Sequence, residues 1–412
     1  MTRFLLLAHG TRGDVDPFVA LAGVLVRRHQ DVTVLTHAPY GEAVAATGAD
    51  FRAVDDAAGY ARHLRRARDL LGGRHLLGGR HHTRVADYYG DADLFLDRVS
   101  VAGGFGQIRR EAEAMAGAGG DTVVVGRLTS CLSGLMAAEL TGSPVCQVSL
   151  SPFQSLTAPM TALHLARSAG TGLNAVRAGL GLPPVTGWSR WLQRADLTVG
   201  LWPRWFDAAG PASPGPLVLT GFPLGDRAAG ETRRAPVPDA GREDVVVVTG
   251  GTGRMLHPAF YTSAVAGLAA AGRRGIVVTP HADLVPRVLP PGVVHRTSLP
   301  FADVLPRVAG VVHHGGMGTL ARALASGTPQ LLLADGADRP DNGARLERLG
   351  LARSLEAHDW SAGTVGREIA RLGPAGTQDL MNGPDPVELL ADRVVALAGR
   401  ARAKSAEGWA VR

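Results

Sequence analysis

The chain is nearly devoid of lysine and poor in cysteine. Lys404 is the single lysine among 412 residues, so arginine guanidinium groups, which stay protonated, carry almost all of the positive charge. The two cysteines, Cys131 and Cys146, are too few for a disulfide framework, and neither has a partner at the spacing of metal ligands. These absences exclude a disulfide-stapled secreted module and predict a reducing compartment.

Long apolar runs are also lacking near the N-terminus. The apolar stretch from Phe4 to Ala8 is followed at once by His9, Arg12 and Asp14, which leaves it too short for a signal peptide or a membrane span. We therefore expect a cytoplasmic protein. Hydrophobic residues make up 45% and charged residues 19%, which is typical of globular domains, and the length suits two or three of them.

Positive charge is concentrated in one segment. Seven arginines and one aspartate lie between Tyr60 and Arg84, an excess equal to the net charge of +6 of the whole chain. A protein that binds nucleic acid needs basic residues along a whole face, so this distribution argues against a nucleic-acid partner. The same segment holds two identical copies, 70–75 and 76–81, whose paired glycines favour a surface loop over a dedicated binding element.

Strands and helices alternate in both halves of the chain. In the first half we expect strands at 3–8, 31–35, 50–54, 122–125 and 144–148, with helices at 17–28, 39–47 and 130–140. In the second half we expect strands at 245–249, 275–279, 310–313 and 330–333, with helices at 258–271, 318–326 and 386–401. Alternation of this kind predicts parallel sheets covered on both faces by helices.

Glycine and proline mark a domain boundary in the region after Leu217. We predict an N-terminal domain of residues 1–220, a linker of residues 221–243, a second domain of residues 244–385, and a C-terminal helix within 386–412 that packs back toward the first domain. Two doubly wound domains leave a cleft at the carboxyl ends of their strands, where open α/β sheets bind ligands.

The segment from Val311 to Leu320 predicts a pyrophosphate site. A strand ends there in two histidines, three glycines and a threonine. Glycines let the backbone approach a ligand, and the amides that open a helix point toward an anion, to which His314 adds a hydrogen-bond donor. A second glycine turn, from Thr249 to Gly253, offers amides and the Thr252 hydroxyl to the distal phosphate.

Two common nucleotide motifs are absent. The sequence contains no G-x-x-x-x-G-K-[ST], which excludes a P-loop for ATP hydrolysis, and no G-x-G-x-x-G, which argues against nicotinamide chemistry.

Carboxylates stand at the ends of two predicted strands. Asp338 lies in a turn after the strand at 330–333, where it could accept hydrogen bonds from sugar hydroxyls or simply cap the next helix. Asp14 follows the first strand and precedes Pro17. It could act as a helix cap, or it could face the cleft and take a proton from a nucleophile.

Together these residues resemble the GT-B glycosyltransferases that use nucleotide sugars, in the branch of the glycopeptide-antibiotic and sterol glycosyltransferases. The run from His313 to Thr319, with 327–331 and 338–342 behind it, is similar to the donor signature of that family. The run from Gly10 to Phe18 resembles the branch's motif with a catalytic aspartate. The resemblance extends over essentially the whole chain and implies an α/β GT-B fold, in which two Rossmann-like doubly wound domains face each other across a cleft.

The resemblance also implies an inverting, metal-independent transfer with Asp14 as the catalytic base. No cofactor is expected beyond the co-substrate, a sugar linked to dTDP or UDP, and the acceptor is a small natural product or lipid-like molecule. The implied nucleobase contacts are Ser298 and Leu299, and the implied sugar contacts are Asp338 and Arg339. The implied diphosphate contacts are Thr252, His314, Gly315, Gly316, Gly318 and Thr319.

Three departures from the family pattern concern the donor. Ser298 stands where many relatives have an aromatic residue, Ala334 replaces a proline, and Arg339 replaces a glutamine although arginine cannot accept a hydrogen bond. These departures predict a modified, deoxy or acidic sugar in place of glucose.

Several alternatives remain open at this stage. A non-catalytic GT-B accessory protein and a nucleotide-sugar epimerase share the architecture, although the presence of both Asp14 and His314 favours an enzyme. Five aromatic residues either line an acceptor site or, as we favour, pack in the core: Trp188, Trp191, Trp202, Trp205 and Phe206. In this family the Arg62–Arg84 segment lies near the acceptor opening, where it either contacts an anionic acceptor, carrier or membrane surface or, as we favour, is a solvated loop. We expect a monomer or a homodimer.

Overall fold

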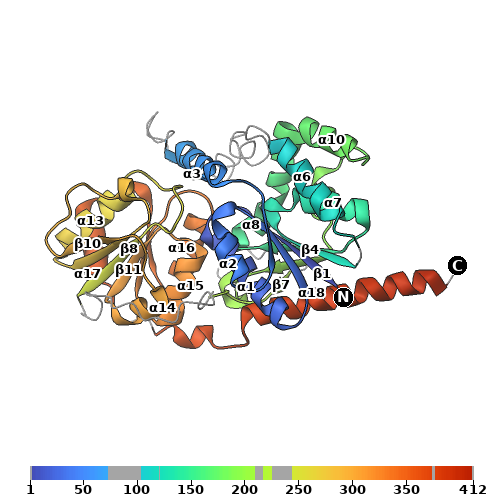
Figure 1. Cartoon of the computed structure of the whole chain (residues 1–412). Helices are drawn as coiled ribbons and strands as arrows, with labels where there is room; N and C mark the ends of the chain where they lie inside the picture. Colours follow the sequence, from blue (N-terminus) through green and yellow to red (C-terminus); the bar gives the residue numbers. More distant parts are fainter. Residues whose placement is uncertain are drawn as a thin grey trace.

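The computed structural model describes residues 2–72, 104–119, 121–208, 217–224, 244–373 and 376–410, and it consists of two α/β domains lying side by side (Figure 1). Each domain is built on one parallel sheet with helices on both faces. The predicted fold class, two Rossmann-like doubly wound domains, is confirmed. The duplicated copies at 70–81 lie outside the described residues apart from the backbone of 70–72, which belongs to a helix.

The N-terminal domain contains a seven-stranded sheet in the order β3-β2-β1-β4-β5-β6-β7, parallel throughout. The strands are β1 (Arg3–Leu7), β2 (Asp31–Thr36), β3 (Asp50–Ala53), β4 (Thr122–Arg127), β5 (Val145–Ser149), β6 (Leu197–Gly200) and β7 (Val218–Leu219). The chain leaves β1 in one direction and later returns to β4 on its other side. The loops after β1 and β4 therefore lie next to each other at the carboxyl edge of the sheet, at a topological switch point.

The C-terminal domain contains a six-stranded sheet in the order β10-β9-β8-β11-β12-β13, again parallel. The strands are β8 (Val245–Thr249), β9 (Arg274–Val278), β10 (Val293–Arg296), β11 (Gly310–His313), β12 (Gln330–Leu333) and β13 (Arg353–Leu355). The last residues of β8 and β11, Thr249 and His313, are paired in register. Both predicted phosphate turns therefore start at neighbouring strand ends.

The first helix begins earlier than the sequence predicts. We expected it from Pro17, but α1 spans Arg12–Arg27 with Pro17 inside it. The reason is a capping box, in which the carboxylate of Asp14 accepts a hydrogen bond from the backbone amide of Thr11, the N-cap residue, and so starts the helix five residues sooner. The predicted helices 130–140, 258–271 and 318–326 differ from the observed ones by one or two residues at their ends. The helix predicted at 386–401 continues to Ala410, and 39–47 is divided between a 3-10 turn and α2.

The remaining helices have the following bounds. In the N-terminal domain they are α2 (Gly41–Ala45), α3 (Ala57–Gly72), α6 (Gly104–Ala116), α7 (Leu132–Thr141), α8 (Pro152–Leu156), α9 (Ala158–His164), α10 (Gly170–Gly179), α11 (Trp188–Leu192) and α12 (Arg204–Ala208). After the second sheet begins they are α13 (Phe260–Ala270), α14 (Phe301–Val304), α15 (Met317–Ser326), α16 (Arg339–Arg348), α17 (Ala362–Ala370) and α18 (Pro386–Ala410).

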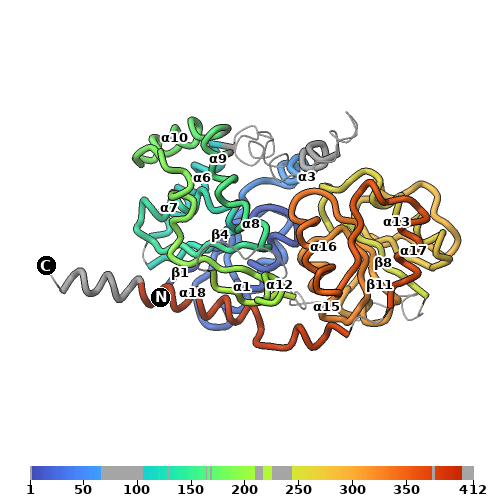
Figure 2. Tube along the Cα trace, turned by 180° about the vertical axis from the view of Figure 1, so that it is seen from behind, coloured from blue at the N-terminus to red at the C-terminus, as the bar shows by residue number. Residues whose placement is uncertain are grey.

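Helix α18 leaves the second domain and packs along α1 of the first, as the view from behind shows (Figure 2). Its apolar side chains Leu390 and Val394 are buried in the same core as Phe4 of β1. At the edge of this contact Arg28 forms ion pairs with Glu388 at 2.5 Å and with Asp392 at 2.7 Å. The C-terminal helix therefore ties the two domains together.

A second apolar cluster joins the domains beneath the site described below. Trp202 and Phe206 of the first domain and Phe222, which follows β7, pack with Leu324 and Leu346 of the second domain, and Trp202 and Phe206 are completely buried. Trp188 and Trp191 are buried in the first domain, and Trp205 is partly buried in the joining cluster. The preference for packing over an acceptor site is confirmed for these aromatic residues.

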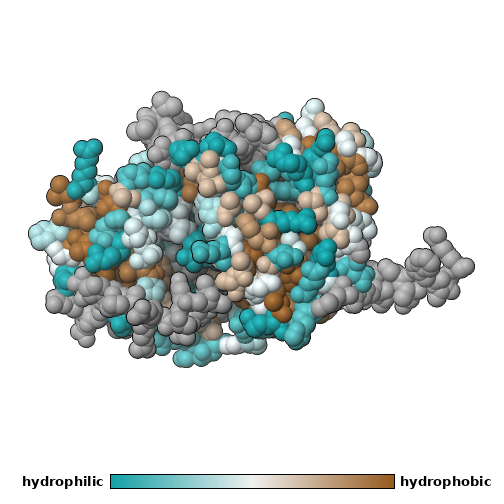
Figure 3. Space-filling view, viewed as in Figure 1, coloured by the Kyte–Doolittle hydropathy of each residue, from teal (hydrophilic) through white to brown (hydrophobic). Residues whose placement is uncertain are grey.

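The surface of the described residues shows small apolar areas between hydrophilic ones (Figure 3). The exposed large hydrophobic side chains lie on separate elements: Leu140, Leu163, Val288, Leu349 and Leu380. None of the described helices combines the length and the apolar character needed to span a bilayer.

Candidate active site

The turn after β1 folds the carboxylate of Asp14 back onto its own backbone. Gly10 has a φ of +130°, and a Cβ atom there would lie only 2.2 Å from Oδ2 of Asp14, so only glycine suits this position. Oδ2 accepts hydrogen bonds from the backbone amide of Thr11 at 2.8 Å and from its hydroxyl at 3.2 Å. The two expected roles of Asp14, helix cap and proton acceptor, are therefore compatible, because the capping hydrogen bonds also fix the carboxylate at the edge of the sheet.

Arg127, the last residue of β4, holds the other carboxylate oxygen. Its Nη2 lies 3.2 Å from Oδ1 of Asp14, and its Nη1 donates to the carbonyl oxygen of His9 at 2.6 Å. The Arg127 side chain is 5% exposed, whereas that of Asp14 is 22% exposed. A carboxylate can accept about four hydrogen bonds, and three positions are occupied here, so Oδ1 keeps one for a ligand.

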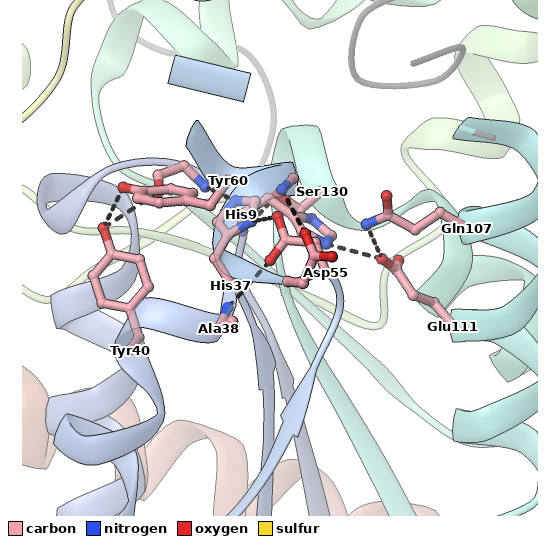
Figure 4. Close-up of polar contacts among 12 residues, drawn as sticks. His9, His37, Ala38, Tyr40, Asp55, Tyr60, Gln107, Glu111 and Ser130 are labelled. Atoms are coloured by element: carbon pink, nitrogen blue, oxygen red, sulfur yellow. Dashed lines mark hydrogen bonds and ion pairs between the residues drawn. The ribbon is translucent and has the colours of Figure 1, made fainter. Parts of the chain in front are cut away.

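His37, which follows β2, holds the turn from behind (Figure 4). The amide of Gly10 donates to Nε2 of His37 at 2.9 Å, so the ring proton is on Nδ1, which donates to Asp55 at 2.7 Å. The second oxygen of Asp55 accepts from the amide of Ala38 at 3.1 Å. Burial lowers the pKa of His37, which keeps the ring neutral and able to accept from Gly10.

On the other side, His314 occupies a slot between two glycines. A Cβ atom on Gly316 would lie 2.6 Å from Nε2 of His314, and one on Gly251 would lie 3.1 Å from its Cε1. Nδ1 of His314 is buried and has no hydrogen-bond partner among the described residues. Burial, and after it the positive charge of Arg339, holds the pKa of His314 well below its usual value. The neutral imidazole lies at the predicted diphosphate position, with the backbone of Thr249 beside it.

The neighbouring histidine, His313, shapes the loop. The amide of Gly315 donates to Nδ1 of His313 at 3.2 Å, so Nε2 donates to the side-chain oxygen of Gln330 at 2.9 Å. Burial lowers the pKa of His313 to about 4. Of the predicted diphosphate contacts, Gly315 thus uses its amide inside the protein, whereas Gly316 is the N-cap of α15.

The first turn of α15 lies directly after this loop. Gly318 is exposed, Thr319 is buried, and the amide of Thr319 donates to the carbonyl oxygen of Gly316 at 3.1 Å. The turn that contains Thr252 follows the adjacent strand β8, and the carbonyl oxygen of Thr252 accepts from Nε2 of His281 at 3.0 Å. The structure thus brings Thr252 and the start of α15 to one edge of the sheet, with the His314 ring between them.

The predicted sugar contacts have different surroundings. Asp338 lies at the start of α16, where Asn342 donates to its Oδ2 at 3.2 Å and Ser151 of the first domain lies beside it. Burial raises the pKa of Asp338. The Arg339 side chain is buried, and its guanidinium donates to the carbonyl oxygens of Asp335 and Met255. Arg339 therefore bridges the loops after β8 and β12, and it adds positive charge beneath the site.

The predicted nucleobase contacts follow β10. Ser298 is exposed, and Leu299 is partly buried against the core of the second domain. This edge offers an apolar contact at Leu299 with open space at Ser298, and no aromatic ring stands at either position.

The two halves of the site meet across the domains. A Cβ atom on Gly253 would lie 3.1 Å from the methyl group of Thr11, so the Thr249–Gly253 turn touches the turn that carries Asp14. A second contact between the domains is that of the Ser151 side chain with Asp338. The predicted base and the predicted diphosphate contacts therefore face each other over a short distance.

Comparisons with known proteins show which proteins this chain resembles. Residues 268–378 match the family described as the erythromycin biosynthesis protein CIII-like, C-terminal domain. The spinosyn forosaminyltransferase structure aligns at a TM-score of 0.68 with 18% identity, over 96% of this chain and 99% of that one. The glycosyltransferase VinC in complex with dTDP aligns at 0.67 with 18% identity, over 97% and 100%. The chain has the GT-B fold and is similar to antibiotic glycosyltransferases.

Curated relatives of this GT-B protein match over shorter regions. A 6-deoxyallosyltransferase of O-mycaminosyltylonolide from Streptomyces fradiae is 45% identical over 64 residues, which are 16% of this chain and 15% of the relative. The vancomycin aglycone glucosyltransferase of Amycolatopsis orientalis is 32% identical over 219 residues, 50% of this chain and 49% of the relative. The chain thus spans about half of the latter and much less of the former.

Sequence reasoning missed several residues of this GT-B site. Arg127, His37 and Asp55 come from three strand ends, and no motif joins them in the sequence. Arg62 and Arg65 of the basic segment are exposed on α3, while most of that segment lies outside the described residues. Among the described residues, no group of three or more His, Cys, Asp or Glu side chains is placed to hold a metal ion.

Proposed function

We propose that this GT-B protein transfers a sugar from a nucleoside-diphosphate sugar to a nucleophile of a small acceptor. One observation carries the proposal: the buried ring of His314 lies at the start of α15 and packs against Gly251, in the Thr249–Gly253 turn that touches the Asp14 turn of the other domain. A diphosphate bound there would accept a hydrogen bond from the His314 ring and would place its sugar toward Asp14.

We propose Asp14 as the base of an inverting transfer. Its partly exposed Oδ1 keeps one position for the acceptor hydroxyl, while Arg127 and Thr11 hold the carboxylate in place. The hydroxyl loses its proton to Asp14 as its oxygen attacks the anomeric carbon from the face opposite the diphosphate. The bond from that carbon to the diphosphate oxygen breaks, and the electron pair leaves with the diphosphate.

The charge that develops on the diphosphate is met by fixed donors. We propose that His314, the Thr252 hydroxyl and the amides at the start of α15 stabilise the leaving group most as this charge grows. Gly315 contributes through its backbone shape, and the buried guanidinium of Arg339 contributes positive charge. With these groups, the transfer needs no metal ion.

For the donor we propose a dTDP-linked deoxy sugar. Arg339 is bonded to two backbone carbonyls, so its head group is not directed at a sugar carboxylate, and Asp338 remains as the acceptor for sugar hydroxyls. A relative is named as a 6-deoxyallosyltransferase, another as a TDP-daunosamine transferase, and VinC was solved with dTDP. For the acceptor we propose a natural-product aglycone, as in several relatives' names.

The test is the release of nucleoside diphosphate from dTDP-linked and UDP-linked sugars, with and without tylactone or the vancomycin aglycone. We expect release that depends on the acceptor and prefers dTDP. Asp14→Asn should lower it about 100-fold or more, in the range of general base catalysis, without weakening dTDP binding. Asp16→Asn is the matched control, because Asp16 lies on the same helix and forms an exposed ion pair with Arg12.

The outcomes separate the alternatives. Full activity of Asp14→Asn would refute the base assignment. Binding of dTDP without turnover of any donor would favour an accessory protein, and conversion of the donor sugar without an acceptor would favour an epimerase.

A further inference from the structure

A second charged cluster lies beside the Asp14 turn and is not used in the mechanism above. His9, the second residue after β1, donates from Nε2 to Oε1 of Glu111 on α6 at 3.0 Å (Figure 4). The His9 side chain is 19% exposed, whereas that of Glu111 is 7% exposed. The pair therefore has a buried carboxylate behind and an imidazole in front, at the carboxyl edge of the sheet where ligands bind.

Glu111 is built to remain a carboxylate. Besides His9, it accepts from the hydroxyl of Ser133 at 2.7 Å and from the side-chain amide of Gln107 at 2.9 Å. Burial alone would raise the pKa of Glu111, but His9 and these hydrogen bonds bring it below its usual value. A buried charge with three donors fixes both the orientation and the tautomer of the ring that it faces.

The other ring nitrogen of His9 is available. Nε2 is bonded to Glu111, so the proton is on that atom and, in the neutral ring, Nδ1 carries the lone pair. No described group forms a hydrogen bond to Nδ1, and this nitrogen is not among the described buried polar atoms that lack a partner. The backbone of His9 is itself fixed, because its amide donates to Ser130 at 3.2 Å and its carbonyl oxygen accepts from Arg127.

Arg127 links this pair to Asp14. One guanidinium contacts the carbonyl oxygen of His9 and the carboxylate of Asp14, so Arg127 joins the backbone of His9 to the side chain of Asp14. The other groups near the His9 ring are His37, with ring centroids 5.6 Å apart, and Asp55 behind it. None of the described residues in this cluster forms a metal site.

We propose that His9, oriented by Glu111, is a second proton acceptor for the acceptor nucleophile, parallel to Asp14. This inference rests on the proposed function. The O–H bond of the nucleophile breaks as its oxygen bonds to the anomeric carbon, and the diphosphate leaves with the electron pair of the broken C–O bond. The proton moves to Nδ1 of His9, and the resulting imidazolium faces the carboxylate of Glu111.

The experiment measures dTDP release from a dTDP-linked deoxy sugar, with water and with tylactone as nucleophiles, in the Asp14→Asn background. We expect Asp14→Asn to keep a rate measurably above that of the uncatalysed reaction. Adding His9→Gln should lower this residual rate about 100-fold, because glutamine can still donate to Glu111 but has no basic atom. Asp14→Asn with His9→Gly should recover part of the rate in added imidazole. His358→Gln, on an exposed turn far along the chain, is the control and should change nothing.

A purely structural His9–Glu111 pair predicts a different pattern. In that case His9→Gln would weaken dTDP binding and thermal stability together, and imidazole would restore no rate to His9→Gly. That result, or a residual rate unchanged by His9→Gln, or no residual rate in Asp14→Asn, would overturn the inference. Failure of the wild type to release dTDP with either nucleophile would contradict the proposed function instead.

Discussion

Gly316→Ala tests the slot that holds His314. The new Cβ atom would lie 2.6 Å from Nε2 and 2.8 Å from Cε1 of the imidazole, a spacing that real Cβ atoms essentially never show. The ring must therefore move. The backbone at Gly316, with φ −69° and ψ 140°, suits alanine, so the substitution changes the ring position more than the fold.

The expected loss follows from the hydrogen bond that His314 would give to the diphosphate. A hydrogen bond to a charged group contributes about 1.5–3 kcal/mol, which corresponds to a loss of about 10-fold to 150-fold in affinity. Exchange of an N-cap glycine for alanine costs the helix about 1 kcal/mol or less, so the protein should remain folded.

The assay is calorimetric titration of dTDP into the wild type and into Gly316→Ala, with thermal unfolding measured in parallel. Gly399→Ala is the matched control, because a Cβ atom there meets nothing within 4 Å and the residue lies on α18. Wild-type affinity in Gly316→Ala, with a fold that is intact by thermal unfolding, would refute the role of His314.

Three further predictions concern the same loops. Burial holds the pKa of His314 well below its usual value, and a bound anion favours the imidazolium, so dTDP should bind more tightly as pH falls from 8 to 6. Calorimetric titration of dTDP at several pH values checks this. An affinity that does not change with pH would count against contact of His314 with the phosphates. The pKa of His313 is lowered to about 4 in the folded chain from 6.5, so its contribution to stability is present above pH 6.5 and is lost as pH falls toward 4. The loss reaches about 3 kcal/mol at most, and chemical denaturation should show a weaker acid dependence for His313→Gln. Gly10→Ala places a Cβ atom 2.2 Å from Oδ2 of Asp14 at a φ of +130°, so it should displace the Asp14 carboxylate. The rate of sugar transfer should fall at least tenfold, while the affinity for dTDP stays within about twofold. An unchanged transfer rate would contradict the geometry of the Asp14 turn.

The sequence predicted the sheets well because their strands are continuous apolar runs. Strands such as β8 and β11 are buried along their whole length, and the glycine turns after them are local in sequence. Short strands such as β7, with two residues, and β13, with three, carry no such signal. The predicted start of α1 at Pro17 was wrong because the capping box formed by Asp14 starts the helix at Arg12.

The supporting residues of the site could not be predicted in the same way. Arg127 reaches Asp14 only because β4 pairs with β1. The order of strands in a sheet cannot be predicted from the sequence of any one strand. His37 and Glu111 reach the turn from β2 and α6 for the same reason. Arg339 shows the converse, because its place in the family pattern implied a sugar contact, whereas the fold directs its guanidinium to two backbone carbonyls.

The central claim, that a diphosphate sugar bound at His314 reacts with a nucleophile beside Asp14, is tested most directly by one rate. This is the acceptor-dependent release of dTDP from a dTDP-linked deoxy sugar, measured for the wild type and for Asp14→Asn with Asp16→Asn alongside. We predict release by the wild type and by Asp16→Asn, and a loss of about 100-fold in Asp14→Asn. Equal rates in all three proteins would contradict the claim.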